Sequence, residues 1–257
     1  MNIKSFKRSL FLLAIGIFLS FSAWQCKSSL QVGVMANTPV DQTFFNDPVS
    51  DSIIKPYKTE LDEKMNIVLN TANEDLEVGR PESKLGNLVS DLSIEVAKSY
   101  YKPLDNKSID FCLLNKGGLR TSIPQGPITL GLVYQVMPFE NELVVVTLSP
   151  EKVTELFDYL AKKGGEPISH ASMGIKDDKA INVLINGQPI EIDRNYKVLT
   201  SDYLARGGDK MNFFLDPIAY EMAGIKLRDA IIVYFEKMAI KNQTIEAKIE
   251  GRIYYEQ

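Results

Sequence analysis

The chain has 257 residues, of which 45% are hydrophobic and 24% are charged, and this is the profile of an ordinary globular protein rather than of a disordered or fibrous one. Its 29 basic and 33 acidic residues give a formal net charge of −4 at pH 7, so no strong positive field would draw the protein to nucleic acid. We therefore expect one large globular domain and no nucleic-acid partner.

Residues 1–25 have the features of a signal segment. Basic residues precede the apolar run 10–21, which is shorter than the roughly 20 residues that a membrane-spanning helix needs. Cys26 follows this run and is similar to the acylated first residue of a bacterial lipoprotein. Cleavage near Ala23, which would leave Cys26 as an ordinary thiol, and a retained membrane anchor are the alternatives. We expect an exported protein of the bacterial cell envelope, attached by a lipid at Cys26 and facing the periplasm or the cell surface.

The composition changes after the signal segment. Residues 26–52 are rich in polar residues with little periodicity, which is typical of a flexible tether. We expect the folded domain to occupy residues 53–257. Its only cysteine, Cys112, lies within an apolar run and is predicted to be a buried thiol, because the domain offers no second cysteine for a disulfide.

Hydrophobic periodicity predicts interleaved helices and strands in the first half of the domain. The clearest helix covers residues 82–98, where apolar residues recur at intervals of three and four. Gly86, within its first turns, costs about 1 kcal/mol relative to alanine, which suggests that another backbone passes close to it. The other elements expected here are a helix over 56–69, a strand over 71–78, a buried strand over 109–114 and a short helix over 128–136.

Capping and turn signals mark the second half. Ser149 followed by Pro150 is typical of a helix start, and Asn186-Gly187 between two β-rich runs predicts a tight hairpin. We expect an α/β (α+β) fold with a mixed sheet, because helices and strands alternate along the chain. The elements expected here are a strand over 142–148, a helix over 151–162, the hairpin over 181–192, a strand over 196–201 and a helix over 227–239.

The string Asn115-Lys-Gly-Gly-Leu-Arg120 follows the predicted buried strand, at a position where α/β sheets often bind ligands. Gly117 and Gly118 let the chain turn and bring backbone N–H groups near an anion, while Arg120 can offer a fork of donors to a phosphate. The alternative is a simple turn with a solvated arginine.

A second string, Asp202-Tyr-Leu-Ala-Arg-Gly-Gly-Asp209, combines an aromatic ring with a carboxylate. The ring of Tyr203 can stack on a base, and Asp209 can accept hydrogen bonds from both hydroxyls of a ribose. Gly208 lets the loop fold back so that both reach one ligand. Phe139, in a loop after a proline, could supply a second aromatic face. The alternative places Tyr203 in the core, Asp209 in a turn and Phe139 over the core as a plug.

Four strings in this order resemble the C-terminal, substrate-binding domain of the 5′-nucleotidase and UDP-sugar hydrolase family, and they cover residues 85–91, 115–120, 128–141 and 196–209. The resemblance implies that family's layered mixed-sheet fold. It also implies that Phe139 and Tyr203 sandwich the base and that Asp209 holds the ribose. The remaining implied contacts are Asn115 to the base or sugar, Arg120 to phosphate, Asn141 as a supporting polar group, and backbone at Gly117, Gly118 and Gly208.

Members of this family also carry an N-terminal metallophosphatase domain with a two-metal site and a catalytic histidine. The only histidine of this chain, His170, lies in no metal-binding context, so we expect it at the surface or in a supporting position. We therefore predict no catalytic residue, metal ligand or cofactor on this chain. The expected partners are a nucleoside or nucleoside monophosphate, a separate metallophosphatase chain that carries the divalent metal, and the membrane through the lipid anchor.

Several residues depart from the family pattern. Lys116 and Lys210 stand where glycine is usual, and Arg206 where a small or polar residue is usual, so these side chains could narrow the pocket or add positive charge. Arg80 lies close to, but out of register with, an arginine that the family uses for phosphate. The departures motivate the alternative of a non-catalytic envelope scaffold or interaction lipoprotein that has lost nucleotide binding. A self-sufficient hydrolase with an unrecognised site is a third hypothesis.

Overall fold

The computed structural model describes residues 47–256. The chain divides into two compact units, residues 1–51 and 52–257, and every element that follows the first described helix belongs to the second unit. The predicted signal segment 1–25 and the lipid-attachment residue Cys26 lie outside the described residues. Within 47–256, no helix combines the length and the apolar character that crossing a bilayer requires.

The first described helix, α2 (Pro48–Met65), starts and ends earlier than the predicted helix 56–69. The carboxylate of Asp47 accepts hydrogen bonds from the amides of Val49 (3.2 Å) and Ser50 (3.4 Å), so an aspartate cap begins the helix within the predicted tether. The helix ends at Met65 because the chain then enters β1 (Val68–Ala72), which pairs with β3 (Gly126–Thr129). The pairing with a distant strand overrides the local helical pattern.

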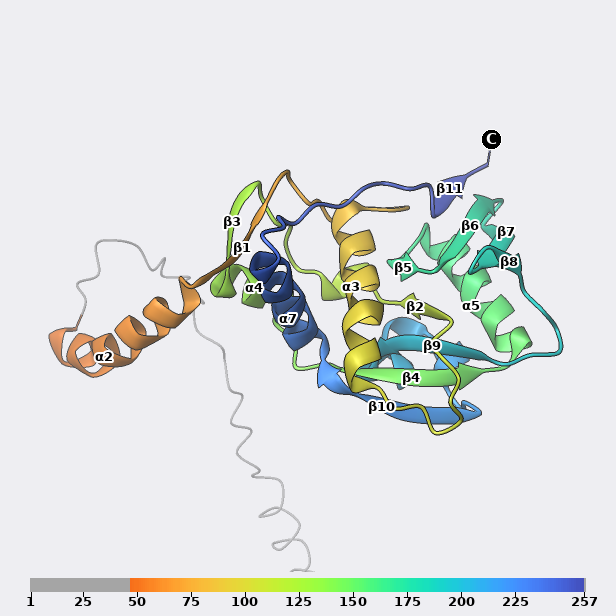
Figure 1. The fold of residues 1–257 in the computed structure, drawn as a ribbon, viewed down its shortest axis with the longest axis horizontal. Coiled ribbons are helices and arrows are strands. Elements are labelled where there is room, and N and C mark those ends of the chain that lie inside the picture. The colour runs from red at the N-terminus through yellow and green to blue at the C-terminus, as the bar shows by residue number, and fades with distance from the viewer. Residues whose placement is uncertain (1–46, 257) are drawn as a thin grey trace, which may run out of the picture. The chain divides into compact units, whose positions relative to one another are not determined.

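A five-stranded mixed sheet forms the centre of the domain (Figure 1). Side chains of its central strands alternate between two cores: Val145 and Leu199 face one, and Val144 and Val198 face the other. Covering both faces explains why these strands are apolar throughout. Its strands, in spatial order, are β10 (Ala219–Lys226), β4 (Glu142–Leu148), β9 (Tyr196–Ser201), β2 (Phe111–Leu113) and β5 (Ile168–Ser169).

Two helices, α3 (Lys84–Tyr100) and α7 (Leu227–Ile240), pack side by side over the first core (Figure 1). The side chain of Ser83 accepts a hydrogen bond from Gly86 N (3.2 Å) and begins α3 two residues later than predicted. A Cβ at Gly86 would lie 2.8 Å from Ser83 Oγ and 3.2 Å from a side-chain carbon of Pro167. The close neighbours of this glycine are therefore side chains, not the backbone that we expected.

The second core lies under α5 (Pro150–Lys163), which begins at the predicted Ser149 cap with Pro150 in the first turn. Its Phe157 stacks on Phe111 of the central sheet, with ring centroids 5.7 Å apart. A four-stranded sheet, in the order β11-β6-β7-β8, completes this side. Its strands are β6 (Ala171–Lys176), β7 (Lys179–Ile185), β8 (Gln188–Pro189) and β11 (Ile253–Tyr255), and the predicted hairpin joins β7 to β8.

The remaining short elements build the loops at one edge of the central sheet. The predicted helix 128–136 is divided, because its first residues belong to β3 and α4 (Leu130–Val136) begins after the Thr129 cap. The layered mixed α/β fold is confirmed. The other short elements are α6 (Asp202–Ala205) and the 3₁₀ helices η1 (Lys116–Gly118), η2 (Gly208–Lys210) and η3 (Asn212–Phe214).

Candidate functional site

A pocket of about 310 Å³ opens where the two central parallel strands end. This volume is at the lower end of the range for small-molecule sites. Eight residues line the pocket, and all belong to the nine predicted from the sequence: Asn115, Gly117, Gly118, Arg120, Phe139, Asn141, Tyr203 and Asp209. The ninth, Gly208, lies directly under the ring of Tyr203, because a Cβ there would be 2.6 Å from a ring carbon.

The topology of the sheet explains why these segments meet. Strands β2 and β9 are parallel neighbours, so the loops that follow them, beginning at Asn115 and Asp202, leave from the same edge. Strand β4 runs antiparallel to β9, and Leu143 pairs with Ser201, so the loop before β4 arrives at that edge too. This loop carries Phe139 and Asn141.

The first loop leaves an arginine with free hydrogen-bonding capacity. Arg120 is exposed, and its guanidinium donates one hydrogen bond, to the carbonyl of Gly117 (3.3 Å). Within residues 47–256 it forms no ion pair. A guanidinium has five N–H donors in a planar fork, so most of them remain available to an anion at the pocket mouth.

The second loop holds the carboxylate of Asp209 in a fixed position. The hydroxyl of Tyr203 donates to Asp209 Oδ1 (2.9 Å) and accepts from the Asp209 amide (3.2 Å), and Asn115 Nδ2 donates to Oδ2 (2.7 Å). The last of these bonds joins the two loops across the pocket. Tyr203 and Phe139 are 47% and 41% exposed, so neither ring is sealed in the core, as the alternative interpretation would require.

The three basic departures from the family pattern do not line the pocket. Arg206 is 75% exposed and lies 4.0 Å from the carboxylate of Asp202. Lys210 is exposed, with φ of 66°, a left-handed conformation in which glycine would carry no steric cost. The pocket is therefore not narrowed by these side chains.

Arg80, the out-of-register phosphate candidate, also lies outside the pocket. Its Nε donates to the carbonyl of Gly165 (2.7 Å), and its guanidinium forms an ion pair with Glu166. The other carboxylate oxygen of Glu166 accepts the backbone amide of Lys116 (2.6 Å), in the first loop. Arg80 therefore supports a pocket loop through Glu166.

Sequence reasoning missed the residues that support the pocket from behind. The hydroxyl of Tyr159 donates to the carbonyl of Asp209 (2.6 Å), and Glu166 holds the first loop. Buried Arg228 donates to the carbonyl of Phe139 (3.4 Å) and pairs with Glu140. Tyr159, Glu166 and Arg228 lie outside the four strings, so no local pattern pointed to them. Hydrogen bonds from Lys226 and Arg228 lower the pKa of Glu140 to about 2.

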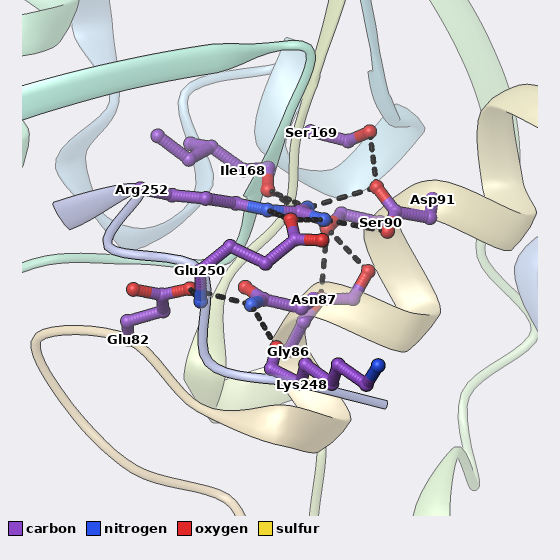
Figure 2. Close-up of polar contacts among 10 residues, drawn as sticks. All are labelled: Glu82, Gly86, Asn87, Ser90, Asp91, Ile168, Ser169, Lys248, Glu250 and Arg252. Atoms are coloured by element: carbon purple, nitrogen blue, oxygen red, sulfur yellow. Dashed lines mark hydrogen bonds and ion pairs between the residues drawn. The ribbon is translucent and has the colours of Figure 1, made fainter. Parts of the chain in front are cut away.

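The polar residues of the first family string, 85–91, also serve the fold (Figure 2). Asn87 donates to the carbonyl of Lys248 (2.8 Å), and Asp91 forms two hydrogen bonds to Arg252 (2.6 and 2.8 Å). They tie the C-terminal segment to α3. This string contributes to the stability of the domain and not to the pocket lining.

No group of three or more His, Cys, Asp or Glu side chains gathers as a metal site in the part of the chain that the structure describes. His170 is exposed and does not line the pocket. Cys112 is fully buried, as predicted, and burial raises the pKa of its thiol.

The structure is a layered α/β domain with a pocket at the carboxyl ends of the parallel strands β2 and β9. The family model of the 5′-nucleotidase C-terminal domain matches residues 67–216, more than half of the chain, and the chain belongs to this family. The resemblance seen in the sequence is thereby confirmed.

Relatives share this domain at low identity. A 5′-nucleotidase of Vibrio parahaemolyticus is 28% identical over 180 residues, which cover 66% of this chain and 30% of the relative. A cell wall protein of Listeria monocytogenes is 24% identical over 239 residues, which cover 79% of this chain and 29% of the relative. The crystal structure of a 5′-nucleotidase precursor from Thermus thermophilus superposes with a TM-score of 0.68 at 24% identity, covering 80% of this chain and 43% of that chain. The shared region thus spans about 30% of the length of the Vibrio and Listeria relatives.

Proposed function

We propose that this chain is an exported nucleotide-binding domain that supplies substrate recognition for 5′-nucleotidase-type phosphate ester hydrolysis. The divalent metal site lies on a separate metallophosphatase chain. One observation carries the proposal: two open aromatic rings, a carboxylate and an arginine without an ion partner among residues 47–256 line one pocket of nucleoside size.

The base binds between aromatic rings in this proposal. Tyr203 and Phe139 come from different loops and both expose ring surface at the pocket. Stacking on an aromatic ring contributes about 1 to 3 kcal/mol per base and tolerates any base. Asn115 and Asn141 line the same pocket and offer amide donors and acceptors to the edge of the base or the sugar.

The sugar binds at Asp209. Each of its carboxylate oxygens already accepts one hydrogen bond, from Tyr203 or from Asn115. An ionised carboxylate can accept about four hydrogen bonds, so two ribose hydroxyls can be added without breaking these contacts. The existing bonds hold the carboxylate in place before the ligand arrives.

The phosphate binds at the first loop. Arg120 has unused donors, and the backbone at Gly117 in the same loop is exposed. Arg120→Met should therefore weaken binding of AMP towards that of adenosine. Binding of adenosine should not change.

The division between binding and cleavage rests on composition and on the relatives. The family resemblance implies that phosphate ester hydrolysis depends on metal ions, and the one histidine of this chain does not line the pocket. The matched relatives are about three times longer than the shared region. Export is supported by the basic and apolar pattern of residues 1–25, by Cys26, and by relatives described as a precursor and as a cell wall protein.

Calorimetry on the whole chain tests the proposal, with adenosine, AMP and a UDP-sugar as ligands. We expect saturable binding of at least one of them and no phosphate release by the chain alone. Phosphate release should begin when a metallophosphatase domain of a 5′-nucleotidase and a divalent metal are added. Robust metal-dependent hydrolysis by the isolated chain would contradict the division of labour, and absence of binding to all three ligands would favour the envelope scaffold.

A further inference from the structure

Two of the loops that line the pocket come from different strands, and one side-chain hydrogen bond links them directly. Loop one is 115–120, after β2, and loop two is 202–209, after β9. Asn115 and Asp209 join them through one side-chain hydrogen bond of 2.7 Å. The distance between the phosphate end and the ribose end of the pocket therefore depends on what holds each loop from behind.

Glu166 holds loop one. Its side chain is only 3% exposed, and a buried carboxylate is costly unless both oxygens are paired. One oxygen pairs with Arg80 and the other accepts the backbone amide of Lys116 at 2.6 Å. Glu166 follows α5 directly, after the glycine turn that ends this helix. The start of η1 is thus tied to the end of α5.

Tyr159, which lies within α5, holds loop two. Its hydroxyl donates to the carbonyl of Asp209 at 2.6 Å, and its ring packs on Phe213, with ring centroids 5.5 Å apart. Burial raises the pKa of Tyr159, which keeps the hydroxyl protonated as a donor at neutral pH. The Asp209 residue that it holds has φ of 52°, an uncommon conformation for a non-glycine residue, so the loop needs outside contacts to keep it.

We infer that Tyr159 and Glu166 are positioning residues of the pocket: Tyr159 on α5 and Glu166 just after this helix set the separation of the two loops, so that Arg120 and the Asp209 carboxylate meet one ligand. Neither residue lines the pocket, and the inference rests on the proposed function. Holding binding groups in place before the ligand arrives raises affinity, because less order has to be created on binding.

The test measures AMP binding to the whole chain by calorimetry, with two variants and two matched controls. The variants are Tyr159→Phe, which removes one hydroxyl, and Glu166→Gln, which keeps one acceptor and removes the charge. Tyr101→Phe removes a hydroxyl that donates to Glu221 at 2.8 Å, and Glu82→Gln alters a carboxylate that accepts the Glu250 amide at 2.8 Å (Figure 2). Neither control residue lines the pocket or contacts its loops.

Each variant should weaken AMP binding about three- to tenfold, since one hydrogen bond contributes roughly 0.5 to 1.5 kcal/mol net. The controls should lower the melting temperature by similar amounts and leave the dissociation constant within about twofold. Glu166→Ala should bind more weakly than Glu166→Gln, because glutamine restores an acceptor for the Lys116 amide. If Glu166→Ala does not fold, the comparison of Tyr159→Phe and Glu166→Gln with their controls still tests the inference.

A spectroscopic reading separates positioning from general stability. In ¹H–¹⁵N spectra of the ligand-free chain, the Lys116 amide resonance should move in Glu166→Gln and stay in place in Glu82→Gln. If wild type binds AMP and both variants bind as tightly as their controls, the inference is wrong while the proposed function stands. If wild type binds none of AMP, adenosine and the UDP-sugar, both are overturned.

Discussion

Charged side chains lie at both ends of the central strands β2 and β9, but they differ in how fully they are paired. At the carboxyl ends, Arg120 has no ion partner among residues 47–256 and the Asp209 carboxylate has acceptor capacity left. At the opposite ends lies a larger cavity of about 800 Å³, where Arg194 pairs with Asp110 and Lys197 pairs with two carboxylates. We therefore assign the proposed ligand site by its unused hydrogen-bonding capacity and not by cavity volume.

Lys197 shows how completely the opposite end is paired. Its ammonium group donates to Tyr101 (2.9 Å), to Glu221 (3.0 Å) and to Asp105, and the side chain is 4% exposed. Burial alone would lower the pKa of Lys197, but these hydrogen bonds outweigh it and raise the pKa above its usual value. The network pins the loop after α3 to β9 and β10, so we assign this end a role in stability.

The largest expected effect is a loss of stability when that network is broken. Lys197→Met keeps most of the side-chain volume and leaves the buried carboxylate of Glu221 without its cation, which should cost about 3 to 5 kcal/mol of unfolding free energy. Urea denaturation measures this loss. Binding of AMP by the folded variant should not change, and a weaker affinity would show that the two ends are not independent.

The next effect concerns the ribose. Asp209→Asn keeps the loop conformation, because asparagine tolerates a left-handed backbone, but it replaces an ionised acceptor by a neutral one. Adenosine binding should weaken by about 1.5 to 3 kcal/mol, while binding of 2′,3′-dideoxyadenosine should change little. Asp110→Asn, at the opposite end, is the matched control and should leave both affinities unchanged. Equal losses of affinity for the two nucleosides would show that Asp209 does not contact the ribose hydroxyls.

A third variant tests the aromatic face. Tyr203→Ala should cost about 1 to 3 kcal/mol of nucleoside binding because one stacked ring is lost, whereas Tyr203→Phe keeps the ring, loses only the hydroxyl bonds to Asp209, and should bind more tightly than Tyr203→Ala. Tyr220→Ala removes an exposed tyrosine from the opposite cavity and provides the control. Calorimetry with adenosine measures both affinities. If Tyr203→Ala and Tyr220→Ala bind adenosine equally well, the base does not stack on Tyr203.

The smallest effect depends on pH. Lys226 and Arg228 lower the pKa of Glu140 from 4.5 to about 2 in the folded chain, so this carboxylate stabilises the fold above pH 4.5 and the contribution is lost as the pH falls towards 2. Glu140→Gln should therefore flatten the dependence of stability on pH between about 5 and 2. Thermal unfolding across this window measures it, and identical slopes for wild type and variant would show that Glu140 contributes nothing.

Elements with strong local signals could be predicted closely. The valine run of β4 and the apolar run of β9 begin and end where predicted, and α5 begins after the expected serine cap. Errors occur where a distant partner decides the structure. The chain leaves α2 early because β1 pairs with β3, and β10 escaped notice because its alternating exposed residues, Tyr220 and Met222, form a strand only through pairing with β4.

The sequence by itself determined the family, through four short strings in the right order, and this resemblance named the eight residues that line the pocket. Only the tertiary structure decided what supports them. The hydrogen bonds from the Lys116 amide to Glu166 and from the Tyr159 hydroxyl to the Asp209 carbonyl each join residues 50 positions apart. No periodicity or short string encodes such a contact, since it exists only after the sheet has brought the loops and α5 together.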